Sequence, residues 1–171
     1  MPISLRFCLL LTAFPAWIAI SCGGTGDSSV TEHSDPLPET LQVIVLDSLK
    51  HDTTAYTQGF EIQDGILWES TGLYGSSTLC KLDASTGVLL QDWPLPDTLF
   101  GEGITIVEDQ IFQLTWQSGL VLSWNLEDPE PVITDTIETQ GWGICAIDTN
   151  TVVTSDGSFQ LKFRNVSDFD I

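Results

Sequence analysis

Three segments of this chain begin alike, and the distance between them limits the folds that the chain can adopt. The segments are Gly59–Gly65, Gly103–Asp109 and Gly143–Thr149, and their first glycines are 44 and 40 residues apart. Each segment reads as an alternating strand, an acidic turn and a second apolar strand. Strand repeats of about 40 to 45 residues are typical of the blades of a β-propeller, which is the fold we expect.

The residues that precede the repeat starts occupy equivalent positions, because the three copies align without gaps at the first glycine. These residues are Gln58, Glu102 and Trp142. A ring of blades would bring them together at the mouth of its central channel.

The rest of the pattern is that of an all-β chain. Short runs rich in Val, Ile, Leu, Thr and Trp are separated by turn sequences, and no segment has a helical period of useful length. In the first repeat we expect strands at 59–63, 66–70, 78–83 and 88–93. About three blades fit in the chain, with a leading strand near 43–46, whereas propellers generally need four or more to close. The simplest expectation is a C-terminal truncation of a longer protein.

The N-terminal residues have the composition of a leader. Residues 1–22 place one positive charge before an apolar run that is too short to span a bilayer, and they end at Cys22. This pattern predicts a signal peptide with lipidation of Cys22, and a plain secretory peptide with an incidental cysteine is the alternative. We expect a flexible tether over 23–40, where Gly, Ser, Thr, Pro and acidic residues predominate, and a partial propeller domain over 41–171. The protein is thus expected to be exported, as a periplasmic or cell-envelope lipoprotein of a bacterium.

The net charge limits the kinds of molecule that the chain can bind, and the cysteine content limits the metal sites and disulfides that it can form. The chain has 24 acidic and 5 basic residues and a formal net charge of -19. Such a surface repels nucleic acid and anionic membrane surfaces, so binding to either is not expected. Cys80 and Cys145 fall in strands of different repeats without metal-ligand spacing, so no metal site is expected. Either a disulfide between them or two buried thiols fits the sequence.

Several motifs follow one another between about residues 41 and 157. They are Tyr-Thr-Gln-Gly at 56–59, Trp-Glu-Ser-Thr-Gly-Leu-Tyr-Gly-Ser-Ser at 68–77, Phe-Gly-Glu-Gly at 100–103, Gln-Leu-Thr-Trp at 113–116 and Gly-Trp-Gly at 141–143. In this order and spacing they resemble the plant and bacterial type of glutaminyl cyclase, also called glutamine cyclotransferase. The resemblance implies a five-bladed propeller that converts the N-terminal glutamine of peptides or proteins to pyroglutamate with loss of ammonia.

The same resemblance implies site residues. The catalytic acid of the family corresponds to Glu102. The substrate-binding residues correspond to Gln58, Tyr56, Phe100, Trp116 and Trp142, where Tyr56 stands in place of the family's usual Phe. Further pocket residues of the family come from later blades that this sequence lacks.

The reaction explains why such residues would serve. The α-amine must attack the amide carbon of its own side chain, so the folded-back conformer must be held and protons must move. Glu102 is expected to take the ammonium proton and to return it to the leaving nitrogen, with a pKa raised if Phe100 and Trp116 exclude water. Gln58 would hydrogen-bond the amide or its oxyanion, and two tryptophan rings would wall the closing ring. Neither a metal nor a cofactor is required.

Other interpretations of the sequence remain open. Trp68, Trp93 and Trp124 lie inside expected strands and are interpreted as core residues. Glu69 and Ser70 match the family motif, yet their place in a second strand favours a structural part. Instead of an enzyme, the chain could be a non-enzymatic exported propeller lipoprotein that binds peptides or a partner, or a fragment without a stable fold.

Overall fold

The computed structural model describes residues 40–171, which contain eleven β-strands and no helix. The predicted signal peptide, Cys22 and all but the last residue of the predicted tether lie outside the described residues. The strands form three antiparallel sheets. The all-β prediction is confirmed, and each sheet corresponds to one predicted blade.

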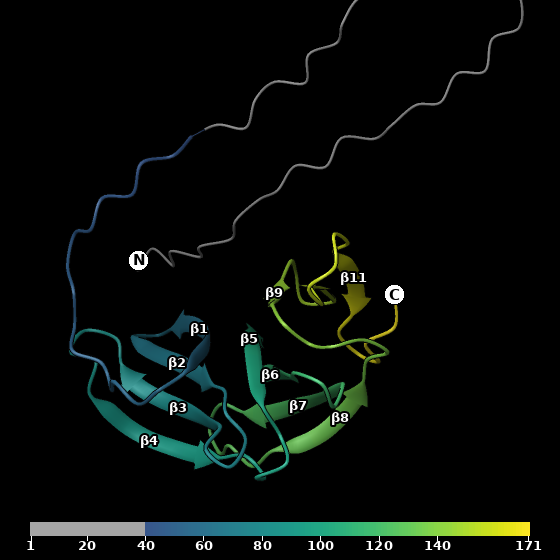
Figure 1. The fold of residues 1–171 in the computed structure, drawn as a ribbon, viewed down its shortest axis with the longest axis horizontal. Helices are drawn as coiled ribbons and strands as arrows, with labels where there is room; N and C mark the ends of the chain where they lie inside the picture. The colour runs from purple at the N-terminus through teal and green to yellow at the C-terminus, as the bar shows by residue number, and fades with distance from the viewer. Residues whose placement is uncertain (1–39) are drawn as a thin grey trace, which may run out of the picture. The chain divides into compact units, whose positions relative to one another are not determined.

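Each sheet takes its strands in chain order. The first sheet contains β1 (Thr57–Gln63), β2 (Ile66–Thr71), β3 (Thr78–Asp83) and β4 (Leu89–Pro94). The second contains β5 (Gly101–Val107), β6 (Gln110–Thr115), β7 (Leu120–Asn125) and β8 (Val132–Thr136). The third contains β9 (Ile144–Ala146), β10 (Thr151–Thr154) and β11 (Lys162–Asn165). In Figure 1 the first strands β1, β5 and β9 lie innermost, and β4 and β8 lie outermost.

The four strands expected in the first repeat are confirmed, each within two residues of its predicted ends. The prediction of a leading strand near 43–46 is wrong. Residues 40–48 belong to a unit separate from the one that contains 49–171, and they have no regular secondary structure and are exposed. Their apolar alternation favours an extended strand, but a strand needs a neighbour to pair its backbone groups. All strands of the three sheets come from residue 57 onward, so the described residues supply no such neighbour.

The glycine that begins each repeat lets neighbouring inner strands touch. A Cβ atom on Gly59 would lie 2.7 Å from the backbone nitrogen of Ile104 and 3.1 Å from Cα of Gly103. A Cβ atom on Gly103 would lie 2.6 Å from the carbonyl oxygen of Trp142 and 3.1 Å from Cα of Gly143. The three glycines therefore lie in a row across β1, β5 and the start of β9. This contact explains in physical terms why glycine recurs at positions 59 and 103.

A hydrogen bond of the same kind links each inner strand to the next. The Glu61 carboxylate accepts a hydrogen bond from the backbone N–H of Ile106 at 2.9 Å. The Thr105 hydroxyl accepts one from the backbone N–H of Ala146, also at 2.9 Å. Each acceptor is the second residue after a repeat glycine, and each donor is the third residue after the next one. The sequence repeat thus specifies the strands of each blade and also the hydrogen bond that links one blade to the next.

Two apolar clusters bury both faces of the second sheet. One cluster joins it to the first sheet and includes Trp68 and Trp124, whose side chains are 2% and 1% exposed. The other joins it to the third sheet through Phe112, Val152 and neighbouring residues. Trp93 stacks on Trp68 with ring centroids 6.0 Å apart. The interpretation of these three tryptophans as core residues is confirmed.

Buried polar side chains tie the first two sheets together. Gln113 is fully buried, donates a hydrogen bond to the Ser70 hydroxyl at 2.7 Å and accepts one from the indole N–H of Trp124 at 3.1 Å. Glu69 is also buried and accepts a hydrogen bond from the Thr57 hydroxyl. Glu69 and Ser70 therefore have the structural part that was expected.

The two cysteines of the described residues do not form a disulfide. Cys80 and Cys145 are half-buried thiols, so the alternative of two separate thiols holds. Burial raises the pKa of the Cys80 thiol. Within residues 40–171, no group of three His, Cys, Asp or Glu side chains is arranged to hold a metal ion, and no helix has the length and apolarity to cross a membrane.

Substitution of Gly103 tests the contact between the inner strands. Gly103→Ala is expected to lower the free energy of unfolding by about 1–3 kcal/mol, because the new methyl group meets backbone atoms that cannot rotate away. The matched control is Gly143→Ala, whose Cβ atom meets only the Ser155 hydroxyl, at 3.0 Å. Urea unfolding measures both variants. Equal losses in the two would contradict this account.

Candidate active site

Glu102 lies where the inner strand β5 departs from regular pairing. The register between β5 and β6 shifts between Gly101 and Ile104, which is the mark of a β-bulge. Gln58 lies within a similar register shift at the start of β1, between Thr57 and Gly59. A bulge changes the direction of the side chain that it carries. Gln58 and Glu102 therefore occupy the same position in the sequence repeat, and each lies at a register shift of its strand.

Trp142 completes the row of residues at the repeat starts. Its carbonyl oxygen accepts a hydrogen bond from the backbone N–H of Gly103 at 2.8 Å. Gln58, Glu102 and Trp142 each come directly before one of the three glycines whose backbones touch. Their backbones therefore lie at the start of three adjacent inner strands.

Both glycines beside Glu102 are required by close approach. A Cβ atom on Gly101 would lie 2.6 Å from the carbonyl oxygen of Thr71 and 2.8 Å from the side-chain nitrogen of Gln113. Gly103 meets the third repeat in the same way, through the carbonyl oxygen of Trp142. The Gly-Glu-Gly motif thus places the acid in the middle blade with a neighbouring blade close on either side. A glutamate in an exposed loop would not need these two glycines.

Phe100 is the centre of an aromatic cluster next to Glu102 in the chain. Its ring centroid lies 6.2 Å from that of Tyr56, 5.6 Å from that of Tyr74 and 5.4 Å from that of Trp116. The structure therefore brings three of the predicted aromatic residues together. Tyr74 was not predicted, although it lies in the motif at 68–77, directly after Leu73, whose φ angle is 97°. That strained backbone is invisible in the sequence.

The remaining predicted aromatic residue, Trp142, is linked to this cluster by Gln140. The indole N–H groups of Trp116 and Trp142 both donate hydrogen bonds to the side-chain oxygen of Gln140, at 2.9 and 3.1 Å. Gln140 was not predicted, and its place two residues before Trp142 is the only sign of it in the sequence. No hydrogen bond or ring contact among the described residues joins Gln58 or Glu102 to the aromatic side chains.

The Glu102 carboxyl has the electrostatics of a proton-transfer group. It is half-buried, and burial raises its pKa from the ordinary 4.5 to about 7. Within the described residues, no hydrogen bond or ion pair reaches its side chain. The direction of the shift is the one predicted from the sequence. A carboxyl group with a pKa near neutrality can both accept and return a proton at physiological pH.

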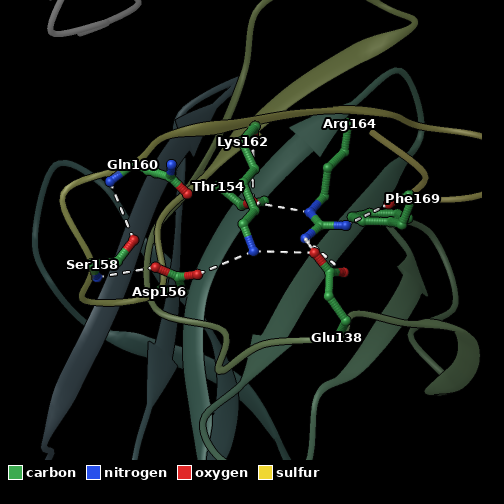
Figure 2. Close-up of polar contacts among 8 residues, drawn as sticks. All are labelled: Glu138, Thr154, Asp156, Ser158, Gln160, Lys162, Arg164 and Phe169. Carbon is green, nitrogen blue, oxygen red and sulfur yellow. Dashed lines mark hydrogen bonds and ion pairs between the residues drawn. The ribbon is translucent and has the colours of Figure 1, made fainter.

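A buried arginine anchors the loop that leads to Trp142. Arg164 is 2% exposed, and its guanidinium donates to the carbonyl oxygen of Phe169 at 2.7 Å and to both carboxylate oxygens of Glu138 at 3.1 Å. Figure 2 shows the Glu138 carboxylate between Arg164 and Lys162, whose ammonium lies 3.1 Å away. Hydrogen bonds from the backbone and from Lys162 lower the pKa of Glu138 to about 2.

The same network holds the turn on which the Trp142 ring rests. Lys162 also pairs with Asp156 at 3.2 Å, as Figure 2 shows, and the Asp156 carboxylate accepts a hydrogen bond from the backbone N–H of Ser158. A Cβ atom on Gly157, between these two residues, would lie 2.6 Å from the Trp142 ring. The indole therefore packs directly on the backbone of this turn.

A cavity of about 560 Å³, which Tyr56 lines and Glu102 does not, lies on the face of the first sheet that carries Glu69 and Thr71. Strand alternation makes this the face opposite to Trp68 and Ser70, which contact the second sheet. The His51 ring nitrogen Nε2 lies 3.0 Å from both Glu69 carboxylate oxygens. This pairing already satisfies the buried acid, and Glu102 does not line the cavity. The strand starts are the better candidate site.

Comparison with known proteins identifies the family. A sequence model described as Glutamine cyclotransferase matches residues 18–171. The chain belongs to this family. A glutaminyl-peptide cyclotransferase of Arabidopsis thaliana is 33% identical over 122 residues, which are 70% of this chain and 38% of that protein. The family resemblance predicted from the motifs is confirmed.

Solved structures match the chain as well, one from a glutaminyl cyclase and one in fold alone. The crystal structure of Myxococcus xanthus glutaminyl cyclase matches with a TM-score of 0.64 and 30% identity, over 71% of this chain and 51% of that one. A Cps50 (Swd1) β-propeller domain of Myceliophteria thermophila, 8% identical, matches with a TM-score of 0.51 over 72% of this chain and 38% of that one, and it shares the fold alone. The predicted β-propeller fold is confirmed. The chain spans about half or less of the length of these proteins.

The raised pKa of Glu102 predicts a stability difference that depends on pH. Because the folded-state pKa of about 7 exceeds the unfolded value near 4.5, the stabilising effect of protonation is full below pH 4.5 and is lost as the pH rises through 7. Glu102→Gln is therefore expected to be more stable than wild type at pH 8, by on the order of 1 kcal/mol after discounting for solvent screening. The difference should vanish near pH 4. Urea unfolding across this range measures it, and a difference that does not change with pH would contradict it.

Removal of the Arg164 side-chain charge tests the anchor of the Trp142 loop. Arg164→Met leaves the buried carbonyl of Phe169 without its donor, and we expect a loss of about 2–4 kcal/mol in the free energy of unfolding. Lys162→Met is the matched control, because Glu138 is 55% exposed and keeps Arg164, and the Asp156 carboxylate keeps its hydrogen bond from the backbone N–H of Ser158, so its loss should be much smaller. Losses of equal size in urea unfolding would mean that Arg164 is not the anchor.

Proposed function

We propose that this chain is a glutaminyl-peptide cyclotransferase, which converts the N-terminal glutamine of peptides to pyroglutamate and releases ammonia. Membership of the glutamine cyclotransferase family supports the reaction class. The single observation that carries the proposal is Glu102: a half-buried acid with a pKa near 7 and no bonded partner among the described residues, at the start of the middle inner strand. The pKa values of Asp83, Glu138 and Asp156 are lowered instead, to about 2.

In the proposed reaction, Glu102 moves protons and forms no bond to carbon. Its carboxylate takes one proton from the substrate ammonium, and the resulting amine attacks the side-chain amide carbon, forming the ring C–N bond. The protonated carboxyl then donates to the amide nitrogen as the old C–N bond breaks. The proton shed by the ring nitrogen returns to Glu102 and departs with ammonia as ammonium. A pKa near 7 suits both directions of transfer.

The neighbouring residues would bind and orient the substrate. Gln58, at the equivalent position on β1, would donate a hydrogen bond to the oxyanion that forms on the amide oxygen. Phe100, Trp116 and Trp142 would enclose the glutamine side chain in its folded-back conformer, and a ring face would attract the ammonium. Tyr56 extends the wall through its contact with Phe100. The tyrosine hydroxyl adds a polar group to this side of the proposed pocket.

Ammonia release from a glutamine-initiated peptide by the full 171-residue chain tests the proposal. Glu102→Gln should lower the turnover by at least a hundredfold, because the amide cannot accept the ammonium proton. Glu130→Gln, which changes an exposed acid, should turn over like wild type. The same peptide with an acetylated N-terminus should release nothing.

Two results would count against the proposal. A cooperatively folded wild-type chain that releases no ammonia would overturn it for this chain and favour a binding protein. Equal turnover in wild type and Glu102→Gln would overturn the part given to Glu102. The expected export of the chain and lipidation of Cys22 concern residues outside those described and stay predictions.

A further inference from the structure

We infer that Gln140 is a positioning residue, whose side-chain oxygen sets the orientation of Trp116 and Trp142 relative to each other. The inference rests on the proposed function insofar as these two rings enclose the substrate. The hydrogen bonds themselves do not depend on that function, so the two ideas can fail separately.

The geometry requires an acceptor at this point. Trp116 follows β6 in the second sheet and Trp142 precedes β9 in the third, and their indole N–H groups meet the same oxygen at 2.9 and 3.1 Å. An indole N–H can only donate, so two of them cannot be satisfied by one amide NH₂ group. The carbonyl oxygen of Gln140 has two lone pairs and serves both donors. One side chain thus links aromatic walls that come from different blades.

The backbone that carries Gln140 is held in place. The N–H of Gly141 donates to the carbonyl oxygens of Thr115 and Trp116, at 3.2 and 3.1 Å. A Cβ atom on Gly141 would lie 2.7 Å from Cβ of Leu114, so the loop lies directly on β6. On the other side, Glu138 is fixed by Arg164, as Figure 2 shows. The side chain of Gln140 therefore starts from a restrained position.

Packing restrains each indole only in part, although the Trp142 ring lies on the backbone of Gly157 and the Trp116 ring contacts Phe100. Trp142 is 44% exposed and Trp116 is half-buried, so neither ring is confined by a full shell of neighbours. A tryptophan in such a place ordinarily samples more than one rotamer. The shared acceptor selects one orientation for each ring. Loss of the acceptor should therefore weaken substrate binding and leave the proton transfers of Glu102 unchanged.

The experiment compares Gln140→Leu, which removes the acceptor, with Gln140→Glu, which keeps it. The first measurement is the ¹H–¹⁵N spectrum of the indole groups, assigned with Trp116→Phe and Trp142→Phe. In Gln140→Leu both indole signals should move upfield and broaden, and in Gln140→Glu both should stay near their wild-type positions. Since Gln140 is exposed, both variants should fold, which urea unfolding checks. Unchanged signals in Gln140→Leu, or movement of only one, would overturn the inference whether or not the chain turns over.

The second measurement is steady-state ammonia release. Gln140→Leu should raise KM for a glutamine-initiated peptide by on the order of tenfold, with kcat within about threefold of wild type and an unchanged pH profile. Gln140→Glu should restore KM. If wild type turns over and Gln140→Leu moves both indole signals without raising KM, the positioning role is overturned while the cyclotransferase proposal stands. If wild type does not turn over, the proposed function fails and the spectra alone decide whether Gln140 orients the rings.

Discussion

The contact between inner strands at Gly59, Gly103 and Gly143 is the constraint on which the rest of the described structure depends. At Gly59 and Gly103 the neighbouring backbone leaves no room for a Cβ atom, so the chain must present glycine where each of these inner strands passes the next one. The residue before each glycine is thereby brought to the same end of adjacent strands. The positions of Gln58 and Glu102 thus follow from how the blades pack, whereas Phe100, Trp116 and Trp142 come from segments between the strands.

Within residues 40–171, the lack of a hydrogen-bond donor to its carboxyl group separates Glu102 from Asp83, Glu138 and Asp156. At Asp83, which ends β3, and at Glu138 and Asp156, which lie in loops, hydrogen bonds from hydroxyl, backbone or ammonium groups lower the carboxyl pKa to about 2. Glu102 lies between two glycines that meet neighbouring blades and has no such donor among the described residues, and burial moves its pKa the opposite way. The environment of Glu102 thus gives this carboxyl a pKa at which it can exchange protons near neutral pH.

Most of the fold could be predicted from local sequence patterns. The features that were missed depend on contacts between residues far apart in the chain. The strands of the first blade and the buried Trp68 and Trp124 could be predicted because alternation and turn sequences act over a few residues. The strand near 43–46 could not be judged locally, since pairing depends on a partner elsewhere. Gln140 was missed for the same reason: an isolated glutamine gives no sign that two indoles, from positions 24 residues before it and two after it, will share its oxygen.

The hydrogen bond that recurs between blades has a direction. The side chains of Glu61 and Thr105 accept a hydrogen bond from the following blade. The backbone N–H groups of Ile106 and Ala146 donate these bonds to the preceding blade. A blade therefore has distinct leading and trailing sides, like a subunit in a head-to-tail assembly. Because a carboxylate and a hydroxyl both serve as the acceptor, the joint tolerates chemical variation while its polarity stays fixed. Duplicated or exchanged blades could thus dock in the correct order without a newly evolved interface.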